Sequence, residues 1–331
     1  MNKKEWGQYN TKREFWLTKE IKKFIEIKKP DIIVDPFAGD GDILNIFKND
    51  YKIYGMDIDP QKKWPLNDSL LDIPLIRGKT LIITNPPYLY KSRSSFFSFN
   101  KTNELYFQKN KEDNLYLIAL KKALEKYNDA IFIIPESFVN KIKHYKESIF
   151  SISVIEKNPF EDTDVPVCVV CFSKKNDLLD HEKKIYKNEK KVSNIKKILE
   201  TKEKIKPNKK EKIIFNDPNG WLAVRLFDQV TKKNRIIFGK KDDFLYDWNK
   251  IKVSSRNYSL VSTNGFYPEK PLLFFKIANE KLESLRMETA DLVLTAFKGN
   301  TKDGTRRRRL DFKTARFLIE ETIEEYKKRK E

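Results

Sequence analysis

The fold is decided by the stretch Ile32-Ile-Val-Asp35-Pro-Phe-Ala-Gly39-Asp-Gly41-Asp-Ile-Leu44. It begins as a short apolar run, turns at two glycines and continues with the spacing of an amphipathic helix. Such a strand, loop and helix hold a ligand above the carboxyl end of the strand, where glycine lets the backbone approach it closely. The spacing is not Gly-x-Gly-x-x-Gly, and the carboxylates of Asp40 and Asp42 would repel a pyrophosphate. We therefore expect a ligand without phosphate groups, the alternative being a tight turn that binds nothing.

The alternation of apolar and helical segments continues along the first half of the chain, from Asp31 to about Phe172. A helix is expected over Tyr116–Tyr127. The strand candidates are Ile32–Val34, Lys52–Met56, Thr80–Thr84, Ala130–Ile134 and Val167–Phe172. This pattern is typical of an α/β domain with a mostly parallel sheet, which we place at residues 1–175.

The second half of the chain has a different composition. Residues 176–212 are rich in charge and poor in large apolar side chains, as in a linker or a solvated helical connection. Apolar density returns at Ile213, so a second, smaller domain is expected over residues 213–331.

The charge balance indicates the class of partner. The 331 residues include 67 Lys and Arg against 48 Asp and Glu, a formal net charge of +19. Such an excess attracts polyanions, which makes nucleic acid the leading partner class. No apolar run approaches the roughly 20 residues that cross a bilayer, and the polar segment Met1–Trp6 is unlike a signal peptide. We expect no membrane partner and a cytoplasmic location.

The cysteines and histidines do not indicate a metal site. Cys168 and Cys171 lie in one strand candidate, where side chains three residues apart point to opposite faces. We therefore expect both to be buried and inert rather than bound to a metal or to each other. His144 and His181 have no cluster of further ligands beside them in the sequence.

Two carboxylates follow the apolar run of the second strand candidate, in Lys52-Ile-Tyr-Gly-Met-Asp57-Ile-Asp59-Pro60. A carboxylate at a strand tip can accept two hydrogen bonds from ribose hydroxyls, and Asp57 is the better placed for this role. Asp59 is expected to cap the helix that Pro60 begins. Asp68 can accept from an adenine amino group, although an aspartate in such a position also serves as a helix N-cap.

The sharpest signal is Leu81-Ile-Ile-Thr-Asn85-Pro86-Pro87-Tyr88, where rigid and polar residues end an apolar strand. Two prolines fix φ and remove two backbone donors, so this loop can only accept hydrogen bonds or stack. The Asn85 side-chain oxygen and the Pro86 carbonyl can accept both hydrogens of an amino group whose delocalised lone pair makes it a poor nucleophile. Tyr88 would stack on the base that carries this group. The structural alternative is a rigid turn with an ordinary Asn cap.

Together these motifs resemble the S-adenosylmethionine-dependent N6-adenine DNA methyltransferases of the gamma order. The resemblance covers roughly the first half of the chain and implies a Rossmann-like catalytic domain followed by a smaller DNA target-recognition domain. It implies catalytic roles for Asn85, Pro86, Pro87 and Tyr88, and for Phe160 as the aromatic on the other face of the base. The cofactor contacts that it implies are Thr11 in the opening motif Gly7–Thr11, Asp35, Phe37, Ala38, Gly39, Gly41, Asp57, Ile58, Asp68 and Ser69. Ser69 departs from the family, which often has an aromatic there against the cofactor adenine.

The activity implied by the resemblance is site-specific DNA methylation. A methyl group would move from S-adenosylmethionine to the N6 of an adenine flipped out of duplex DNA, within a restriction-modification system whose cognate endonuclease acts separately. RNA and protein-glutamine methyltransferases share the Asn-Pro-Pro-Tyr motif and are alternatives, as is a nucleic-acid-binding module without catalysis. The opening motif, the Phe160 loop and the basic C-terminal half favour DNA.

The C-terminal half contains a run of Arg306, Arg307, Arg308 and Arg309 in a stretch rich in glycine and polar residues. Four consecutive arginines cannot all lie on one face of a helix or strand, and an amphipathic helix follows at Phe312. We expect a mobile loop, fixed to a core by that helix, whose arginines contact DNA phosphates or bases. A solvated basic tail is the alternative.

Overall fold

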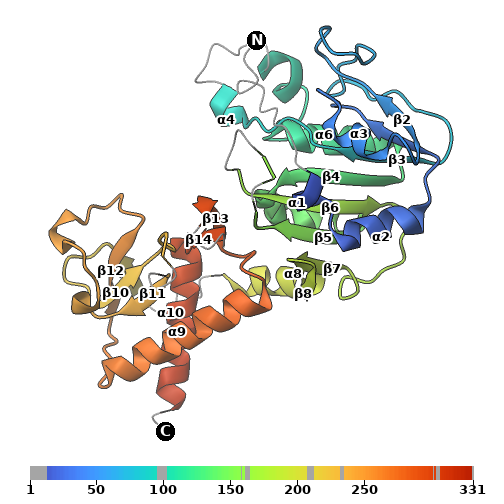
Figure 1. The fold of residues 1–331 in the computed structure, drawn as a ribbon. Coiled ribbons are helices and arrows are strands. Elements are labelled where there is room, and N and C mark those ends of the chain that lie inside the picture. The colour runs from blue at the N-terminus through green and yellow to red at the C-terminus, as the bar shows by residue number, and fades with distance from the viewer. Residues whose placement is uncertain are drawn as a thin grey trace. The chain divides into compact units, whose positions relative to one another are not determined.

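The computed structural model describes residues 13–94, 103–157, 159–160, 165–206, 212–231, 235–300, 302 and 306–329 (Figure 1). The chain divides into two compact units, Met1–Lys191 and Val192–Glu331. The expected opening motif with Thr11 lies outside the described residues. Within the described ranges, no helix is long and apolar enough to cross a membrane.

Unit 1 is built on a sheet with the strand order β2-β1-β3-β4-β6-β5-β7-β8. β1 pairs in parallel with β2 and β3, β3 with β4, and β5 with β7, whereas β6 runs antiparallel to β4 and β5. The strands are β1 Ile32–Asp35, β2 Lys52–Gly55, β3 Thr80–Thr84, β4 Asp129–Pro135, β5 Ile149–Ile155, β6 Val167–Ser173, β7 Lys184–Lys187 and β8 Lys190–Asn194. This is a Rossmann-like α/β sheet, so the predicted fold class is confirmed.

Helices connect the parallel strands and pack on the sheet. α3 contacts β1 and β2, and α6 contacts β4. The helices of unit 1 are α1 Arg13–Trp16, α2 Lys19–Lys28, α3 Asp42–Phe47, α4 Lys91–Ser94, α6 Leu115–Lys126 and α7 Ile142–Tyr145. The helix predicted over Tyr116–Tyr127 is α6, whose first turn is capped by Asn114 through its side-chain oxygen.

The five strand candidates correspond to β1, β2, β3, β4 and β6, but β5 was not predicted. Ser151 and Ser153 interrupt its apolar run, yet both are buried because β5 lies between β6 and β7 inside the sheet. Cys168 and Cys171 are free thiols buried in β6, and burial raises the pKa of both. The expectation that both cysteines are buried is confirmed.

Residues 176–212 were expected to form a linker or a solvated helical connection, and they contain both strands and a helix. They include β7, β8 and the helix α8 Ile195–Lys204, and the boundary between the units falls after Lys191, inside β8. Each element buries few side chains, among them Ile185, Ile195 and Ile198. The segment contains few apolar residues, and it was predicted to be a linker or a helical connection for that reason. The few that it contains are nevertheless buried.

Unit 2 combines an antiparallel sheet of order β11-β10-β12-β9 with a hairpin of β13 and β14. After α8, its elements are β9 Lys212–Phe215, β10 Leu222–Arg225, β11 Ile237–Gly239, β12 Tyr258–Asn264, α9 Pro271–Glu288, β13 Thr295–Asn300, β14 Arg306–Arg309 and α10 Phe312–Lys328. α9 and α10 pack together, and their buried residues share one apolar core with the sheet.

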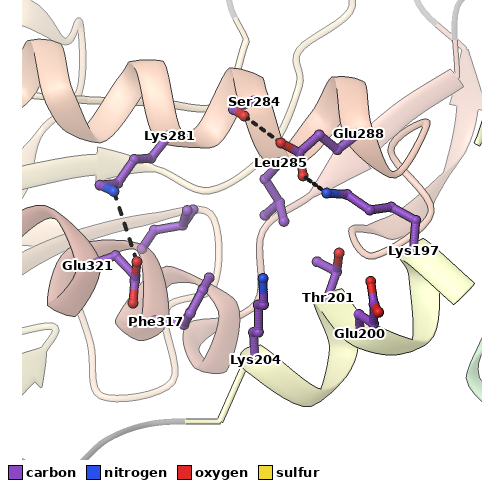
Figure 2. A pocket seen from close by; sticks show the side chains of 11 residues that line it. Lys197, Glu200, Thr201, Lys204, Lys281, Ser284, Leu285, Glu288, Phe317 and Glu321 are labelled. Atoms are coloured by element: carbon purple, nitrogen blue, oxygen red, sulfur yellow. Dashed lines mark hydrogen bonds and ion pairs between the residues drawn. The ribbon is translucent and has the colours of Figure 1, made fainter.

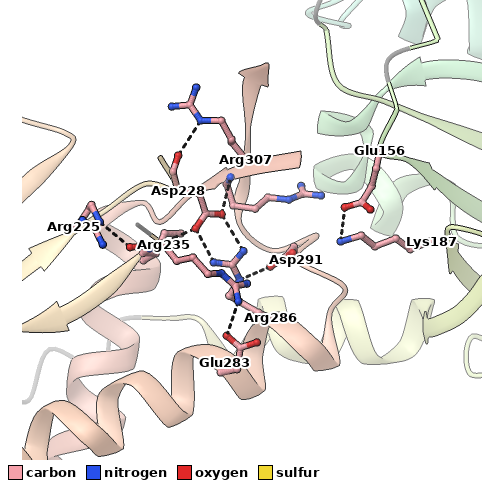
Figure 3. A network of polar contacts seen from close by, with 11 residues as sticks. Glu156, Lys187, Arg225, Asp228, Arg235, Glu283, Arg286, Asp291 and Arg307 are labelled. Atoms are coloured by element: carbon pink, nitrogen blue, oxygen red, sulfur yellow. Dashed lines mark hydrogen bonds and ion pairs between the residues drawn. The ribbon is translucent and has the colours of Figure 1, made fainter. Parts of the chain in front are cut away.

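A buried polar network fixes the β13–β14 hairpin in unit 2 (Figure 3). Arg286 of α9 donates to both carboxylate oxygens of Asp228 at 3.0 Å and to Asp291 at 2.7 Å. The backbone N–H of Arg308 in β14 donates to the same Asp228 carboxylate at 3.1 Å. Burial raises the pKa of Asp228, but the hydrogen bonds and charge of Arg286 outweigh it and leave the pKa lowered. Asp228 is therefore held as an anion that joins α9 to β14.

Candidate active site

Three predicted site residues of unit 1 lie at the carboxyl edge of the parallel strands. Asp35 ends β1, Asp57 follows β2 and Asn85 follows β3. Since these strands pair in parallel, with β1 between β2 and β3, their carboxyl ends meet at one edge of the sheet. Glu136, which sequence analysis did not single out, follows β4 at the same edge and is buried.

The glycine loop between β1 and α3 needs its two glycines for conformation. Gly39 has φ +51° and Gly41 has φ +86°, both in the left-handed region. A Cβ on Gly41 would lie 2.7 Å from a ring carbon of Trp64, whereas a Cβ on Gly39 would have no atom within 4 Å. The loop is therefore tight on the side of Gly41 and open beside Gly39, where a ligand can approach the backbone.

Asp35 is buried beneath this loop, and its pKa is raised. One of its oxygens accepts from the hydroxyl of Thr84 at 2.6 Å and from the N–H of Phe37 at 3.0 Å. Burial raises the pKa of Asp35 to about 7, although these two hydrogen bonds lower it in part, and the charge of Asp57 adds to the rise. A cation placed against this carboxyl would favour its ionised form.

Asp57 organises the loop as well as presenting a carboxylate. One oxygen accepts from the N–H of Gly39 at 2.8 Å, and the other accepts from the N–H of Asp59 at 2.9 Å. The side chain is buried, but each carboxylate oxygen can accept a second hydrogen bond. Ile58 beside it is 39% exposed and offers an apolar surface at the strand tip. Asp59 accepts from the N–H of Gln61, as a turn cap does.

Trp64 completes this side of the loop and was missed by sequence analysis. Its indole N–H donates to the carbonyl of Gly39 at 3.0 Å, and its ring fills the space that a Cβ on Gly55 would need. Its chain segment lies beside the tip of β2, where Asp57 forms a bridge with Leu66. An aromatic side chain within the polar segment after Pro60 was the signal available in the sequence.

Asp68 caps a short turn over residues 69–71, not the helix that sequence analysis gave as the alternative. One oxygen accepts from the N–H of Leu70 at 3.1 Å, and the other accepts from the hydroxyl of Tyr106 at 2.8 Å. Burial, followed by this hydrogen bond, raises the pKa of Tyr106, which stays a donor. Ser69 is buried and accepts from the side-chain amide of Asn67 at 2.8 Å.

The Asn85–Tyr88 segment forms the other half of the site. The two prolines are buried, Asn85 is half-buried and Thr84 before it is fully buried. The hydroxyl of Tyr88 lies 2.5 Å from the side-chain oxygen of Asn85 and 2.6 Å from the carbonyl of Ile133. It carries one proton and donates to one of these oxygens at a time. The acceptor assigned to a substrate amino group is therefore in contact with the neighbouring tyrosine.

Phe160 also lies beside Tyr88. Its ring centroid lies 6.2 Å from that of Tyr88, with the planes at 67°. Tyr116 of α6 meets Tyr88 from another direction, at 6.4 Å and 89°. The structure brings Tyr88 and Phe160 together edge to face rather than as two parallel rings with room for a base between them.

The arginine run lies in unit 2 and is a strand, not a loop. Side chains alternate along β14, so Arg306 and Arg308 point inward and are 2% and 0% exposed. Arg307 and Arg309 are half-exposed on the other face. The expectation that all four contact DNA is corrected for Arg306 and Arg308, because buried guanidinium groups do not reach a phosphate.

Unit 2 also has a cavity of about 190 Å³ lined by α8, α9 and α10 (Figure 2). Its charged side chains pair with one another, as Lys197 does with Glu288 at 2.7 Å and Lys281 with Glu321 at 3.9 Å. Thr201, Ser284 and Phe317 also line it, and no predicted site residue does. Three lysines and three glutamates line it, so its formal charges cancel, and we assign it no ligand.

No family model matches the chain, and a search of curated proteins found no match. Solved structures with similar folds include a protein of Listeria monocytogenes provisionally assigned as a class I S-adenosylmethionine-dependent methyltransferase. It shares 18% identity over 50% of this chain and 60% of its own, with a TM-score of 0.36.

Two further structures are similar. The methyltransferase subunit of a type I restriction-modification system from Streptococcus thermophilus shares 15% identity over 52% of this chain and 47% of its own, with a TM-score of 0.33. A provisionally assigned RNA methyltransferase from Pyrococcus horikoshii shares 15% identity over 53% of this chain and 91% of its own, with a TM-score of 0.33. The chain spans less than two thirds of the length of the Listeria and Streptococcus proteins. At these identities and TM-scores, the similarities assign no function to the chain.

Proposed function

We propose that the protein is an S-adenosylmethionine-dependent methyltransferase that modifies the N6 of adenine in duplex DNA. The observation that carries the proposal is the meeting of two motifs at one sheet edge. The Gly39–Gly41 loop and Asp57 stand at the ends of β1 and β2, and Asn85 stands at the end of the adjacent strand β3. A cofactor over the first two strands would bring its reactive group next to a base amino group at the third.

The residues at this edge fit the chemistry of S-adenosylmethionine. The open space beside Gly39 admits a ligand against the backbone, and Asp57 can accept from ribose hydroxyls. Asp35, with Thr11 from the opening motif, would hold the methionine part, whose ammonium group favours ionised Asp35. Phe37, Ala38, Gly41 and Ile58 would complete the pocket, with Asp68 and Ser69 near the adenine. The bound cofactor supplies an electrophilic methyl group on a sulfonium.

Asn85 and its neighbours would activate the substrate nitrogen. Its side-chain oxygen and the Pro86 carbonyl accept the two amino hydrogens, which favours a pyramidal nitrogen with its lone pair directed at the methyl group. The bound cofactor would supply the methyl group to this nitrogen and keep its sulfur as a neutral thioether, and the surplus amino proton would be released to solvent. Tyr88 and Phe160 would hold the flipped base between their rings after they part from their present edge-to-face contact.

We propose DNA as the substrate because of the positive net charge of the chain and the basic second unit. The net charge of +19 favours a polyanion, and a basic second unit can hold a duplex while one base is extruded. We propose that the enzyme acts in the cytoplasm in a restriction-modification system, with a separate endonuclease. RNA and protein-glutamine methylation are the alternatives, since they also use an amino or amide nitrogen.

Transfer of labelled methyl groups separates these substrate classes. The full chain is incubated with methyl-labelled S-adenosylmethionine and with genomic DNA, total RNA or a mixed protein extract. We expect label in DNA alone, and loss of most of it in Asn85→Ala with cofactor affinity retained, because the lost acceptor matters most as the nitrogen pyramidalises. Label confined to RNA or protein would overturn the proposed substrate, and no transfer to any class would overturn the proposed enzyme.

A further inference from the structure

Unit 2 carries arginine side chains that lie over phenylalanine rings. The guanidinium carbon lies 4.6 Å from the ring centroid of Phe297 for Arg307, 5.0 Å from that of Phe312 for Arg256, and 5.6 Å from that of Phe215 for Arg316. Cation–π contacts of this kind hold a planar guanidinium in a defined orientation. We name as the arginine–aromatic strip the residues Arg256, Arg307, Arg309, Arg316, Phe215, Phe227, Phe297 and Phe312.

The strip is continuous along the unit. Phe227 stacks on Phe297 at 6.2 Å, and its backbone forms a bridge with Arg309 of β14. The guanidinium of Arg309 donates to the backbone carbonyl of Arg256 at 2.8 Å. Phe312, beneath Arg256, stacks on Phe215 at 4.5 Å with the planes at 23°. Ring contacts and one hydrogen bond therefore connect β9, β14 and the start of α10.

The four arginines of the strip are not ion-paired with any carboxylate that the structure describes. Among the residues that the structure describes, no carboxylate lies within ion-pair distance of them, in contrast to Arg286 and Arg329. Their hydrogen bonds go to backbone carbonyls, as from Arg307 to Asp228 and from Arg316 to Ile213. Each guanidinium has five N–H donors, so most donors are left for another molecule.

Two of these cations also lie close together. Burial lowers the pKa of Arg309, and the positive charge of Arg256 lowers it further, while Asp311 opposes the shift less strongly. Arg256 is exposed and Arg307, Arg309 and Arg316 are half-exposed, so solvent and ligands can reach them. An anion bound between Arg256 and Arg309 would relieve their repulsion.

We propose that the arginine–aromatic strip binds the phosphate backbone of duplex DNA, an inference that rests on the proposed function. The phenylalanine faces hold the guanidinium groups in place, so less side-chain freedom is lost when a phosphate binds. The buried Asp228–Arg286 network orients β14 so that Arg307 and Arg309 face outward. Arg256 and Arg316 come from elsewhere in the sequence and extend the site beyond the arginine run.

The test measures binding of the full chain to a fluorescently labelled duplex across a range of salt concentrations. One variant combines Arg256→Gln, Arg307→Gln, Arg309→Gln and Arg316→Gln, and single substitutions are measured as well in case the combination unfolds. The matched control combines Arg235→Gln and Arg329→Gln, which remove exposed arginines that pair with Glu283 and Glu325. Thermal unfolding checks that each variant is folded.

We expect each lost phosphate contact to reduce the slope of log affinity against log salt by about one unit, with little dependence on sequence. The control should keep the parental slope. If all strip variants keep the parental slope while the parent still transfers labelled methyl groups to DNA, the strip does not bind the DNA backbone. The proposed function would then still stand. A parent that binds duplex RNA through the strip but neither binds nor methylates DNA would overturn both.

Discussion

The phenolic oxygen of Tyr88 lies 2.5 Å from the side-chain oxygen of Asn85. The tyrosine thus donates toward the oxygen that we assign to a hydrogen of the target amino group. Its ring is 8% exposed and meets Phe160 edge to face. In the proposed function, a base would enter between these rings after they part from this contact.

Tyr88→Phe should favour entry of the target base. It keeps the ring for stacking and removes the hydroxyl that competes for Asn85, so affinity for a duplex with 2-aminopurine at the target should rise by up to about tenfold. Tyr88→Ala should instead weaken it, because stacking is lost. The fluorescence of 2-aminopurine reports both. Tyr127→Phe, which removes a hydroxyl bonded to Pro74, is the control. Weaker binding in Tyr88→Phe than in the parent would contradict the competition.

Asp57→Ala should weaken binding of S-adenosylmethionine by about 1.5–3 kcal/mol, because a charged acceptor for the ribose is lost. The substitution also releases the N–H of Gly39 and loosens the loop. Calorimetry gives the affinity. Asp59→Ala, two residues away, removes only a turn cap and should bind the cofactor as the parent does. Equal losses in the two variants would show that the whole segment, not the Asp57 carboxylate, holds the ligand.

The pH dependence of the free energy of unfolding should show the raised pKa of Asp35. Its pKa is about 7 in the folded protein against 3.8 in its ordinary state, so between these values the folded state keeps a proton that the unfolded state releases. The contribution of Asp35 to stability is therefore present below pH 4, falls as the pH rises and is lost above about pH 7. Relative to Asp35→Asn, the parent should lose at most about 4 kcal/mol across this window. Urea unfolding at several pH values measures it, and a constant difference would refute the raised pKa.

Arg286→Ala should destabilise unit 2 severely. It leaves the Asp228 carboxylate buried without its main partner, which typically costs 3–5 kcal/mol. Hydrogen exchange should show the loss in β14 and α9 rather than in β1 and β3. Arg329→Ala, at an exposed ion pair, should cost under about 1 kcal/mol. A mild effect of Arg286→Ala would mean that the network does not fix the hairpin.

Local patterns predicted the residues that end strands, because a polar residue after an apolar run is visible in a short window. Asp35, Asp57 and Asn85 were found in this way, and the parallel sheet brings them to one edge. Thr84 and Trp64 were missed because their contacts with Asp35 and Gly39 join residues 49 and 25 positions apart. Such contacts depend on packing that no short window contains.

The structure of the arginine run could not be predicted from a short window either. Alternation along a strand would have divided Arg306 and Arg308 from their neighbours, but the glycines and polar residues around them indicated a loop. Their burial depends on packing between distant parts of unit 2. For example, the backbone N–H of Arg308 donates to Asp228, which lies 80 positions away in the sequence. The strands β7 and β8 in the charged segment 176–212 were likewise not predicted, because its few buried isoleucines are dispersed.

The most direct measurement is the identity of the methylated nucleoside. Duplex DNA is incubated with the full chain and S-adenosylmethionine, digested to nucleosides and analysed by mass spectrometry, with Asn85→Ala as the matched control. We predict N6-methyladenine from the parent and little or none from the variant. N4-methylcytosine as the product, or equal amounts of N6-methyladenine from parent and variant, would contradict the account.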